Sequence, residues 1–129
     1  MAGNSRTKFA LVGTGSRAMN MFTAPLVSRF HDQGELVGIC DSNPGRLELH
    51  NSLLNEDFDH KDVPAFLADD FDRMIEQTKP DSIIVATVDR FHDYYINRAL
   101  EMGCDAITEK PMTINAQKCN AILETVKRT

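Results

Sequence analysis

The sequence predicts an α/β fold in which a doubly wound parallel sheet lies between two layers of helices, a three-layer α/β/α domain. Short apolar runs alternate with longer amphipathic segments along the chain, which is typical of βαβ units. A glycine-rich turn directly follows the first apolar run. The chain has 129 residues, an ordinary length for one domain, and no linker-like segment divides it. We therefore expect a single domain over residues 1–129.

Five strands are expected, at residues 9–12, 36–40, 63–66, 83–86 and 106–108. The first and the fourth are almost continuously apolar, as is usual for strands of a parallel sheet that is covered on both faces. Pro64 in the third favours a strand start or a sheet edge, because proline has no N–H to donate to a neighbouring strand.

The first two helices are predicted between these strands. One spans residues 16–30, where Pro25 favours a kink or a late start. The next begins with Asn43 as its N-cap and Pro44 as its first residue, since both residue types are preferred at these positions.

Three more helices complete the alternation. Asp70 is the expected cap of a helix that ends near residue 79. A helix over residues 91–102 is followed by Gly103, which is placed where a C-terminal glycine belongs. The last helix begins near Asn115 and carries a narrow apolar stripe.

Composition and charge exclude several classes of function. Lys plus Arg is 14 and Asp plus Glu is 19, so the net charge is −5. This acidic balance provides no basic surface for nucleic acid or for anionic lipid. No apolar stretch approaches the length that a bilayer requires, and the N-terminus has no signal-peptide core. We expect a cytoplasmic protein with neither a nucleic-acid nor a membrane partner.

Cysteine and histidine usage predicts neither a disulfide framework nor a metal site. The sequence contains three cysteines with no paired spacing, which favours a reducing compartment. His31, His50 and His60 lack the spacing of metal ligands. We expect these three histidines at the surface.

The glycine-rich turn has the pattern Gly-x-Gly-x-x-Ala. Its position between a strand and a helix is the context that a dinucleotide-binding fingerprint requires. The first glycine allows a sharp turn, the second lets backbone N–H groups approach a pyrophosphate, and the alanine keeps helix and strand close. The serine and arginine would add a hydroxyl and a cation to the phosphates. The candidate cofactor-binding residues are Gly13, Thr14, Gly15, Ser16, Arg17 and Ala18. The alternative is a structural turn without a ligand.

Asp41 ends the second strand, 23 residues after Ala18. A carboxylate near this separation accepts hydrogen bonds from the adenosine ribose and repels a 2′-phosphate, so NAD is expected rather than NADP. The alternative for Asp41 is a polar strand end or a helix cap. Arg46, one turn into the following helix, keeps NADP open because a guanidinium pairs well with a 2′-phosphate.

Two polar segments, residues 86–92 and 108–111, follow the fourth and fifth strands. Both lie at C-terminal strand ends, where open α/β sheets bind their ligands. Lys110 is a candidate catalytic residue, because its charge beside a substrate hydroxyl would help that hydroxyl to lose its proton as hydride leaves.

Glu109, Lys110 and Pro111 form the short motif that carries a family resemblance. The sequence resembles the N-terminal Rossmann domain of the glucose–fructose oxidoreductase / inositol dehydrogenase / MocA (Gfo/Idh/MocA) family, from the glycine turn to the last helix. Glu-Lys-Pro follows the fifth strand in that family. The resemblance implies a catalytic-site role for Lys110 and a cofactor ribose contact for Glu109, with Pro111 in the same cofactor-binding loop. The alternative for Lys110 is a solvated loop lysine.

The segment after the fourth strand resembles the family's Thr-Pro-Asn-x-x-His. Thr87 and His92 match that pattern, whereas Val88 and Asp89 stand in place of the proline and asparagine. The resemblance implies that Thr87, Val88 and His92 line the cleft that binds the nicotinamide and its ribose. The alternative for His92 is a residue at a helix N-terminus that is satisfied by local backbone.

The resemblance also implies that residues 1–129 are the truncated N-terminal part of a larger protein, since family members carry a second domain that supplies the substrate contacts. We expect the fragment to bind dinucleotide without turning over substrate, and to expose an apolar patch where its neighbour would pack. The whole protein is expected to be a homo-oligomeric, NAD-dependent oxidoreductase acting on a hydroxyl of a sugar, polyol or cyclitol. Two alternatives remain open: a glycoside hydrolase of the same family that oxidises its sugar transiently, and a non-catalytic nucleotide-sensing domain.

Overall fold

A five-stranded parallel sheet forms the centre of the computed structural model, which describes residues 6–15, 18–87 and 92–108. The strand order is β3-β2-β1-β4-β5, and all four strand pairs are parallel. The first strand therefore lies in the middle, as a doubly wound sheet requires. The strands are β1 (Thr7–Val12), β2 (Gly34–Asp41), β3 (Ala65–Leu67), β4 (Ser82–Val85) and β5 (Asp105–Thr108).

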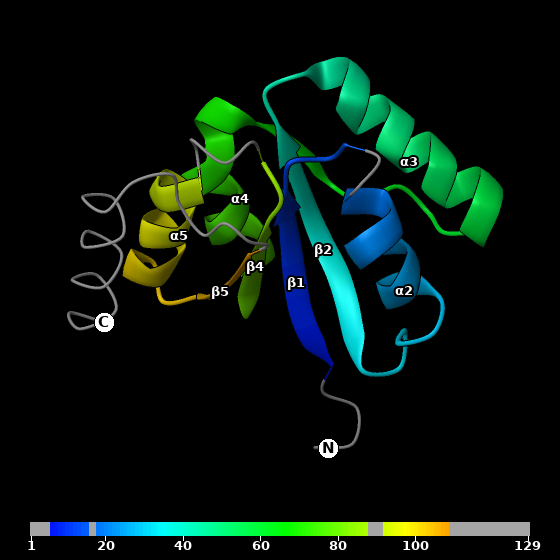
Figure 1. Ribbon diagram of the computed structural model, residues 1–129, viewed down its shortest axis with the longest axis horizontal. Coiled ribbons are helices and arrows are strands. Elements are labelled where there is room, and N and C mark those ends of the chain that lie inside the picture. The colour runs from blue at the N-terminus through cyan, green and yellow to red at the C-terminus, as the bar shows by residue number, and fades with distance from the viewer. Residues whose placement is uncertain (1–5, 16–17, 88–91, 109–129) are drawn as a thin grey trace.

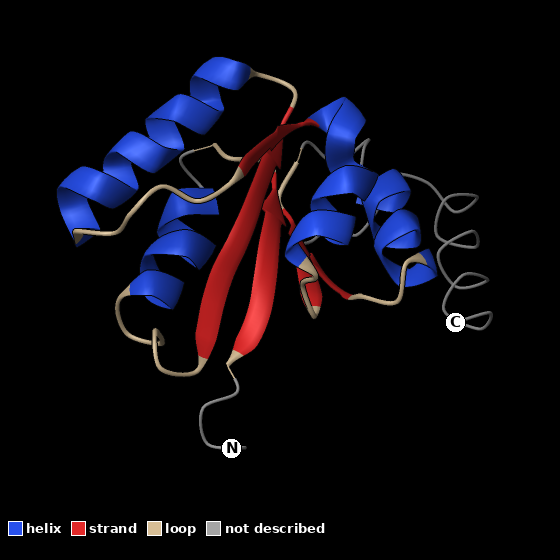
Figure 2. Cartoon of the chain, turned by 180° about the vertical axis from the view of Figure 1, so that it is seen from behind, coloured by secondary structure: helices blue, strands red, loops and turns tan. Residues whose placement is uncertain are grey.

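Helices cover both faces of this sheet. Helices α2 (Ala24–Val27) and α3 (Pro44–Phe58) lie on one face, and α4 (Phe71–Thr78) and α5 (His92–Glu101) lie on the other (Figures 1 and 2). The core is accordingly divided into two clusters of buried side chains. Strand β1 contributes Ala10 and Val12 to the cluster with α4 and α5, and Leu11 to the cluster with α2 and α3. This alternation follows because successive side chains of a strand point to opposite faces, and it confirms the three-layer fold.

The expected strands are present, with shifted ends. Strand β1 begins two residues before the expected 9–12, and β2 extends past both ends of 36–40. Strand β3 covers Ala65–Leu67 rather than residues 63–66 and lies at the sheet edge. Pro64 precedes it and contributes only its carbonyl, which accepts a hydrogen bond from the N–H of Ile39 at 3.0 Å. The proline therefore marks a strand start at an edge, as predicted.

The first helix differs from the expected span of 16–30. A π-helical turn, η2 (Met19–Thr23), leads into α2, which ends at Val27. Pro25 has no N–H to donate to the preceding turn, and the N–H of Ala24 donates to the carbonyl of Met19, five residues earlier. The expected irregularity at the proline is therefore a π turn immediately before it.

Most of the expected helix ends are confirmed. The Asn43 side chain accepts hydrogen bonds from the N–H groups of Gly45 at 2.9 Å and Arg46 at 3.4 Å, which caps α3. Gly103 follows α5 with a φ of +87°. Asp70 occupies the N-cap position of α4, but its side chain makes no capping hydrogen bond. A 3₁₀ turn, η3 (Ala68–Asp70), leads into the helix. The helix expected from residue 115 lies outside the described residues.

Candidate functional site

The carboxyl ends of three central strands meet where the glycine turn begins. The N–H of Gly13 donates to the carbonyl of Cys40 at 2.8 Å, and the N–H of Ala86 donates to the carbonyl of Val12 at 2.8 Å. These bonds continue the pairing of β1 with β2 and with β4 past the end of β1. The turn is therefore held between both neighbouring strands at the sheet edge where open α/β folds bind ligands.

Gly13 is required at this position by two independent features. Its φ is +93°, a conformation that side chains disfavour. A methyl group placed on it would lie 2.6 Å from the carbonyl carbon of Ala86 and 2.7 Å from the backbone nitrogen of Thr87. The sharp turn expected from the sequence is present, and it brings Thr87, a predicted wall residue, against the glycine turn.

Gly15 differs from Gly13 in what surrounds it. A methyl group placed on Gly15 would meet no described atom within 4 Å. Packing within the described chain therefore does not explain this glycine. Its carbonyl accepts a hydrogen bond from the N–H of Met19 at 3.1 Å, so a helical turn begins at this residue. The absence of a side chain here, with no described atom near its place, suits an anion that must approach the main chain closely.

Asp41 is buried, only 5% exposed, and its carboxylate anchors the glycine turn. One oxygen accepts from the backbone N–H of Thr14 at 2.8 Å and from the Thr14 hydroxyl at 2.9 Å. The other accepts from the N–H of Asn43 at 2.9 Å. A carboxylate offers about four acceptor positions, and the three donors found among the described residues leave one of them, on Oδ1. Asp41 therefore has a structural role at the strand end and retains one acceptor position for a ligand.

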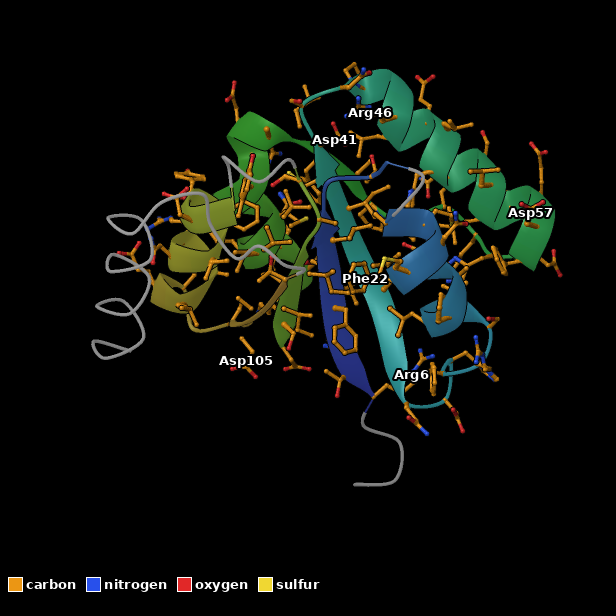
Figure 3. The ribbon with its side chains drawn as sticks, in the orientation of Figure 1. Arg6, Phe22, Asp41, Arg46, Asp57 and Asp105 are labelled. Atoms are coloured by element: carbon orange, nitrogen blue, oxygen red, sulfur yellow. The ribbon has the colours of Figure 1, made fainter. Side chains whose placement is uncertain are left out.

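Arg46 lies exposed in the first turn of α3, at the same end of the sheet as Asp41 (Figure 3). Ala18, the last residue of the glycine pattern, is 1% exposed and packs in the cluster that contains Leu11 and Ile39. The small side chain at this position therefore allows the close approach of helix and sheet that the pattern predicts.

The prediction that His50 lies at the surface is wrong. This residue is 1% exposed, and its Nε2 lies 2.9 Å from the hydroxyl of Thr23. Burial lowers the pKa of His50, while a hydrogen bond with the Thr14 backbone and the charge of Asp41 act in the opposite direction. The signal was available in the sequence, since Leu47, His50 and Leu54 follow the i, i+3, i+7 spacing of a buried helix face.

The described cysteines supply no nucleophile. Cys40 and Cys104 are both free and buried. Burial, followed by the charges of Asp41 and Asp70, raises the pKa of Cys40 to about 12, and burial also raises the pKa of Cys104. Both thiols are therefore protonated near neutral pH, where reactive cysteines are thiolates. Within residues 6–15, 18–87 and 92–108, no group of three or more His, Cys, Asp or Glu side chains is arranged to bind a metal ion.

The structure describes some of the predicted site residues and leaves others out. It describes Gly13, Thr14, Gly15, Ala18, Asp41, Arg46 and Thr87, and it places His92 as the first residue of α5. The remaining predicted residues, Ser16, Arg17, Val88, Glu109, Lys110 and Pro111, lie outside the described residues. The roles assigned to them stay predictions.

An apolar groove of about 420 Å³ lies away from this edge of the sheet. Phe9 and Ile84 from the sheet, Phe22 and Pro25 from the first helical segment, and Ile107 of β5 are among its lining residues (Phe22 is labelled in Figure 3). Ile107 is 40% exposed. The groove is not the candidate ligand site, because it also reaches Thr7 and Gly34 at the amino ends of β1 and β2.

In the described part of the chain, no helix combines the length and the apolar character that a membrane span needs.

Comparison with known proteins gives three findings. A family model described as "Oxidoreductase family, NAD-binding Rossmann fold" matches residues 7–129. YteT of Bacillus subtilis (strain 168) is 41% identical over 112 residues, which are 87% of this chain and 26% of YteT. D-glucoside 3-dehydrogenase of Escherichia coli (strain K12) is 29% identical over 125 residues, which are 97% of this chain and 33% of that protein. The chain thus spans a third or less of the length of these relatives.

Among solved structures, the WlbA dehydrogenase of Bordetella pertussis, crystallised with NADH and UDP-GlcNAcA, has a TM-score of 0.80. The match covers 96% of this chain and 35% of that protein at 23% sequence identity. This likeness shows a shared fold.

Proposed function

The chain belongs to the Gfo/Idh/MocA oxidoreductase family, whose NAD-binding Rossmann domain it matches, and from this premise we propose that its glycine turn holds NAD(H) for an exchange of hydride with a sugar-like hydroxyl compound. The observation that carries the proposal is the contrast between two glycines in one turn. The need for glycine at position 13 is explained by its positive φ and by the close backbone of Ala86 and Thr87. At position 15, by contrast, a methyl group would meet no described atom within 4 Å. A diphosphate that approaches the main chain needs such space.

The donors and acceptors of the site fit a dinucleotide. Main-chain amides of the glycine turn would bind the diphosphate, as amides that precede a helix commonly do. The remaining acceptor position of Asp41 would bind one hydroxyl of the adenosine ribose. The Asp41 carboxylate, which accepts these three hydrogen bonds, would repel a 2′-phosphate. We therefore propose NAD rather than NADP as the cofactor, with Arg46 directed to solvent.

The nicotinamide side of the site is proposed from the matched motifs. When bound, NAD supplies the acceptor for a hydride. Thr87, Val88 and His92 would border the nicotinamide ribose, and Glu109 would contact the same ribose. Lys110 would hold the substrate hydroxyl and favour the loss of its proton, with Pro111 shaping the loop. Substrate contacts beyond Lys110 would come from the part of the protein that this chain does not span.

The substrate class is proposed from the relatives. One relative is named for its action on a D-glucoside, and the Bordetella dehydrogenase was crystallised with a sugar nucleotide. We propose a sugar, polyol or cyclitol hydroxyl as the position that is oxidised. The glycoside-hydrolase alternative makes a different prediction, because transient oxidation recycles NADH on the enzyme, whereas a dehydrogenase releases it as product.

The proposal is tested by titrating NADH into the 129-residue protein and following the fluorescence of NADH. We expect saturable binding, with NADPH binding more weakly because its 2′-phosphate meets the Asp41 carboxylate. ADP-ribose should compete with NADH, since it carries the same diphosphate and adenosine. An absence of saturable NADH binding, or tighter binding of NADPH than of NADH, would contradict the cofactor assignment.

A further inference from the structure

The Thr14 side chain is buried in the glycine turn and bonds to Asp41. Both residues are 5% exposed. The Thr14 hydroxyl donates to Oδ2 of Asp41 at 2.9 Å, and the Thr14 N–H donates to the same oxygen at 2.8 Å. A hydroxyl has a single proton to donate, so the Thr14 side chain has none left for a phosphate. The hydroxyl of this predicted cofactor-binding residue therefore acts on the carboxylate of Asp41.

The Asp41 carboxylate is held from two sides. Thr14 fixes Oδ2 from the turn after β1, and the N–H of Asn43 donates to Oδ1 at 2.9 Å from the loop before α3. Figure 3 shows Asp41 at the end of β2, close to the start of α3. The terminal torsion of an aspartate side chain has broad preferences, so the orientation of the carboxylate depends on these donors. Two donors on Oδ2 and one on Oδ1 make the two oxygens distinct.

The orientation of the carboxylate decides what the remaining acceptor position of Oδ1 can bind. In the proposed function, this position receives a hydroxyl of the adenosine ribose. NADPH carries a phosphate in place of the 2′-hydroxyl, so a well-placed acceptor contributes nothing to its binding. A group that is fixed before the ligand arrives binds more tightly, because it is not ordered at the cost of binding free energy. A residue that fixes Asp41 should therefore favour NADH and leave NADPH unaffected.

We propose that Thr14 is a positioning residue that determines cofactor specificity: its hydroxyl orients the Asp41 carboxylate so that Oδ1 accepts the 2′-hydroxyl of NAD(H). The inference rests on the proposed function and deepens it. A merely structural threonine would change the stability of the glycine turn and, through the turn, the binding of both cofactors to the same extent. The ratio of the Kd for NADPH to the Kd for NADH therefore separates the two roles.

The test measures both Kd values and the midpoint of thermal unfolding, with each Kd taken at a temperature where the variant is fully folded. Thr14→Val keeps the shape of threonine without its hydroxyl, and Thr14→Ser keeps the hydroxyl. The matched control is Thr23→Val. Thr23 is 1% exposed and its hydroxyl lies 2.9 Å from Nε2 of His50, so the same substitution removes a buried hydrogen bond that does not involve Asp41.

We expect Thr14→Val to raise the Kd for NADH about threefold to tenfold, which corresponds to roughly one net hydrogen bond. The Kd for NADPH should stay within about twofold, so the preference for NADH falls. Thr14→Ser should retain the preference. Thr23→Val should lower the unfolding midpoint and leave the preference unchanged. In an Asp41→Asn background, Thr14→Val should change the Kd for NADH less than about twofold, because the hydroxyl acts through the carboxylate.

The role of Thr14 is overturned if folded Thr14→Val changes both Kd values by the same factor or changes neither. It is also overturned if Thr14→Ser or Thr23→Val loses the preference as strongly as Thr14→Val does. If Thr14→Val does not fold, Thr14→Ala, which also lacks the hydroxyl, takes its place in the same comparison. Failure of the unaltered protein to bind NADH overturns the proposed function itself, and this result comes from the unaltered protein alone, so the two failures are distinguishable.

Discussion

Replacing Gly15 with alanine tests our proposal that this glycine is needed for a ligand, whereas Gly13 is needed for the fold. The added methyl group meets no described atom within 4 Å, and the backbone of Gly15 is outside the positive-φ region that excludes side chains. A glycine-to-alanine change at a compatible position stabilises a protein by about 0.4–1 kcal/mol, because the unfolded chain loses freedom. We therefore expect Gly15→Ala to fold with an unfolding free energy equal to or slightly above that of the unaltered protein.

The same methyl group occupies the space through which a diphosphate would approach the amides. Loss of one hydrogen bond to a charged group costs about 1.5–3 kcal/mol, so the Kd for NADH should rise roughly 10- to 150-fold. The assay is a fluorescence titration with NADH, combined with urea unfolding of the same preparations. The reasoning is refuted if Gly15→Ala binds NADH within about twofold of the unaltered protein.

Gly13→Ala is the matched control for this pair of measurements. Its methyl group would lie 2.6 Å from the Ala86 carbonyl, and the φ of +93° is itself unfavourable for alanine by about 1–2 kcal/mol. We expect Gly13→Ala to lose more than this amount of unfolding free energy, because the crossing with the segment after β4 must also open. A Gly13 variant as stable as the Gly15 variant would contradict the distinction between the two glycines.

Three further predictions follow from the same geometry. Asp41→Asn replaces one acceptor oxygen by a donor, so it should weaken NADH binding and reduce the preference for NADH over NADPH at least several-fold, as measured by parallel titrations; an unchanged preference would contradict the ribose assignment. Because the pKa of His50 is lowered below 6.5 in the folded state, the free energy of unfolding should fall as the pH drops below about 6.5, and urea unfolding across this range should show a smaller fall in His50→Leu. The Arg98 guanidinium donates two hydrogen bonds to the Asp72 carboxylate, at 2.7 and 2.9 Å, and thereby lowers the pKa of Asp72 below 3.8. The stabilisation that this ion pair contributes should therefore be lost only as the pH falls below 3.8. Because both side chains are partly exposed, Asp72→Asn should lower the unfolding free energy by at most about 1 kcal/mol in urea unfolding at neutral pH.

The sequence predicts the sheet well because its strands are short apolar runs with clear ends. Ile83 to Val85 form an uninterrupted apolar run with two β-branched isoleucines and a valine, which is typical of a buried strand. Pro64 marks the start of the edge strand because it has no N–H to donate. The π turn before Pro25 was not predictable in detail, since the proline indicates only that a hydrogen bond is missing. How the chain compensates depends on its packing against the rest of the fold.

The sequence predicted which residues form the candidate site better than it predicted the hydrogen bonds between them. Thr14 and Asp41 are 27 residues apart, and their contact exists because β1 and β2 pair in parallel with Val12 opposite Cys40. The lack of metal-ligand spacing around His50 predicted a surface position, which is wrong. Its spacing between Leu47 and Leu54 indicated the buried face, but its partner Thr23 could be identified only once the π turn was placed.

A crystal structure of the chain with bound NADH would test the central claim most directly. The account predicts that the diphosphate lies on the main-chain amides of the glycine turn beside Gly15, with the adenosine ribose against Asp41. A dinucleotide bound at another surface, or a glycine turn whose open space is filled by the protein's own side chains, would contradict it.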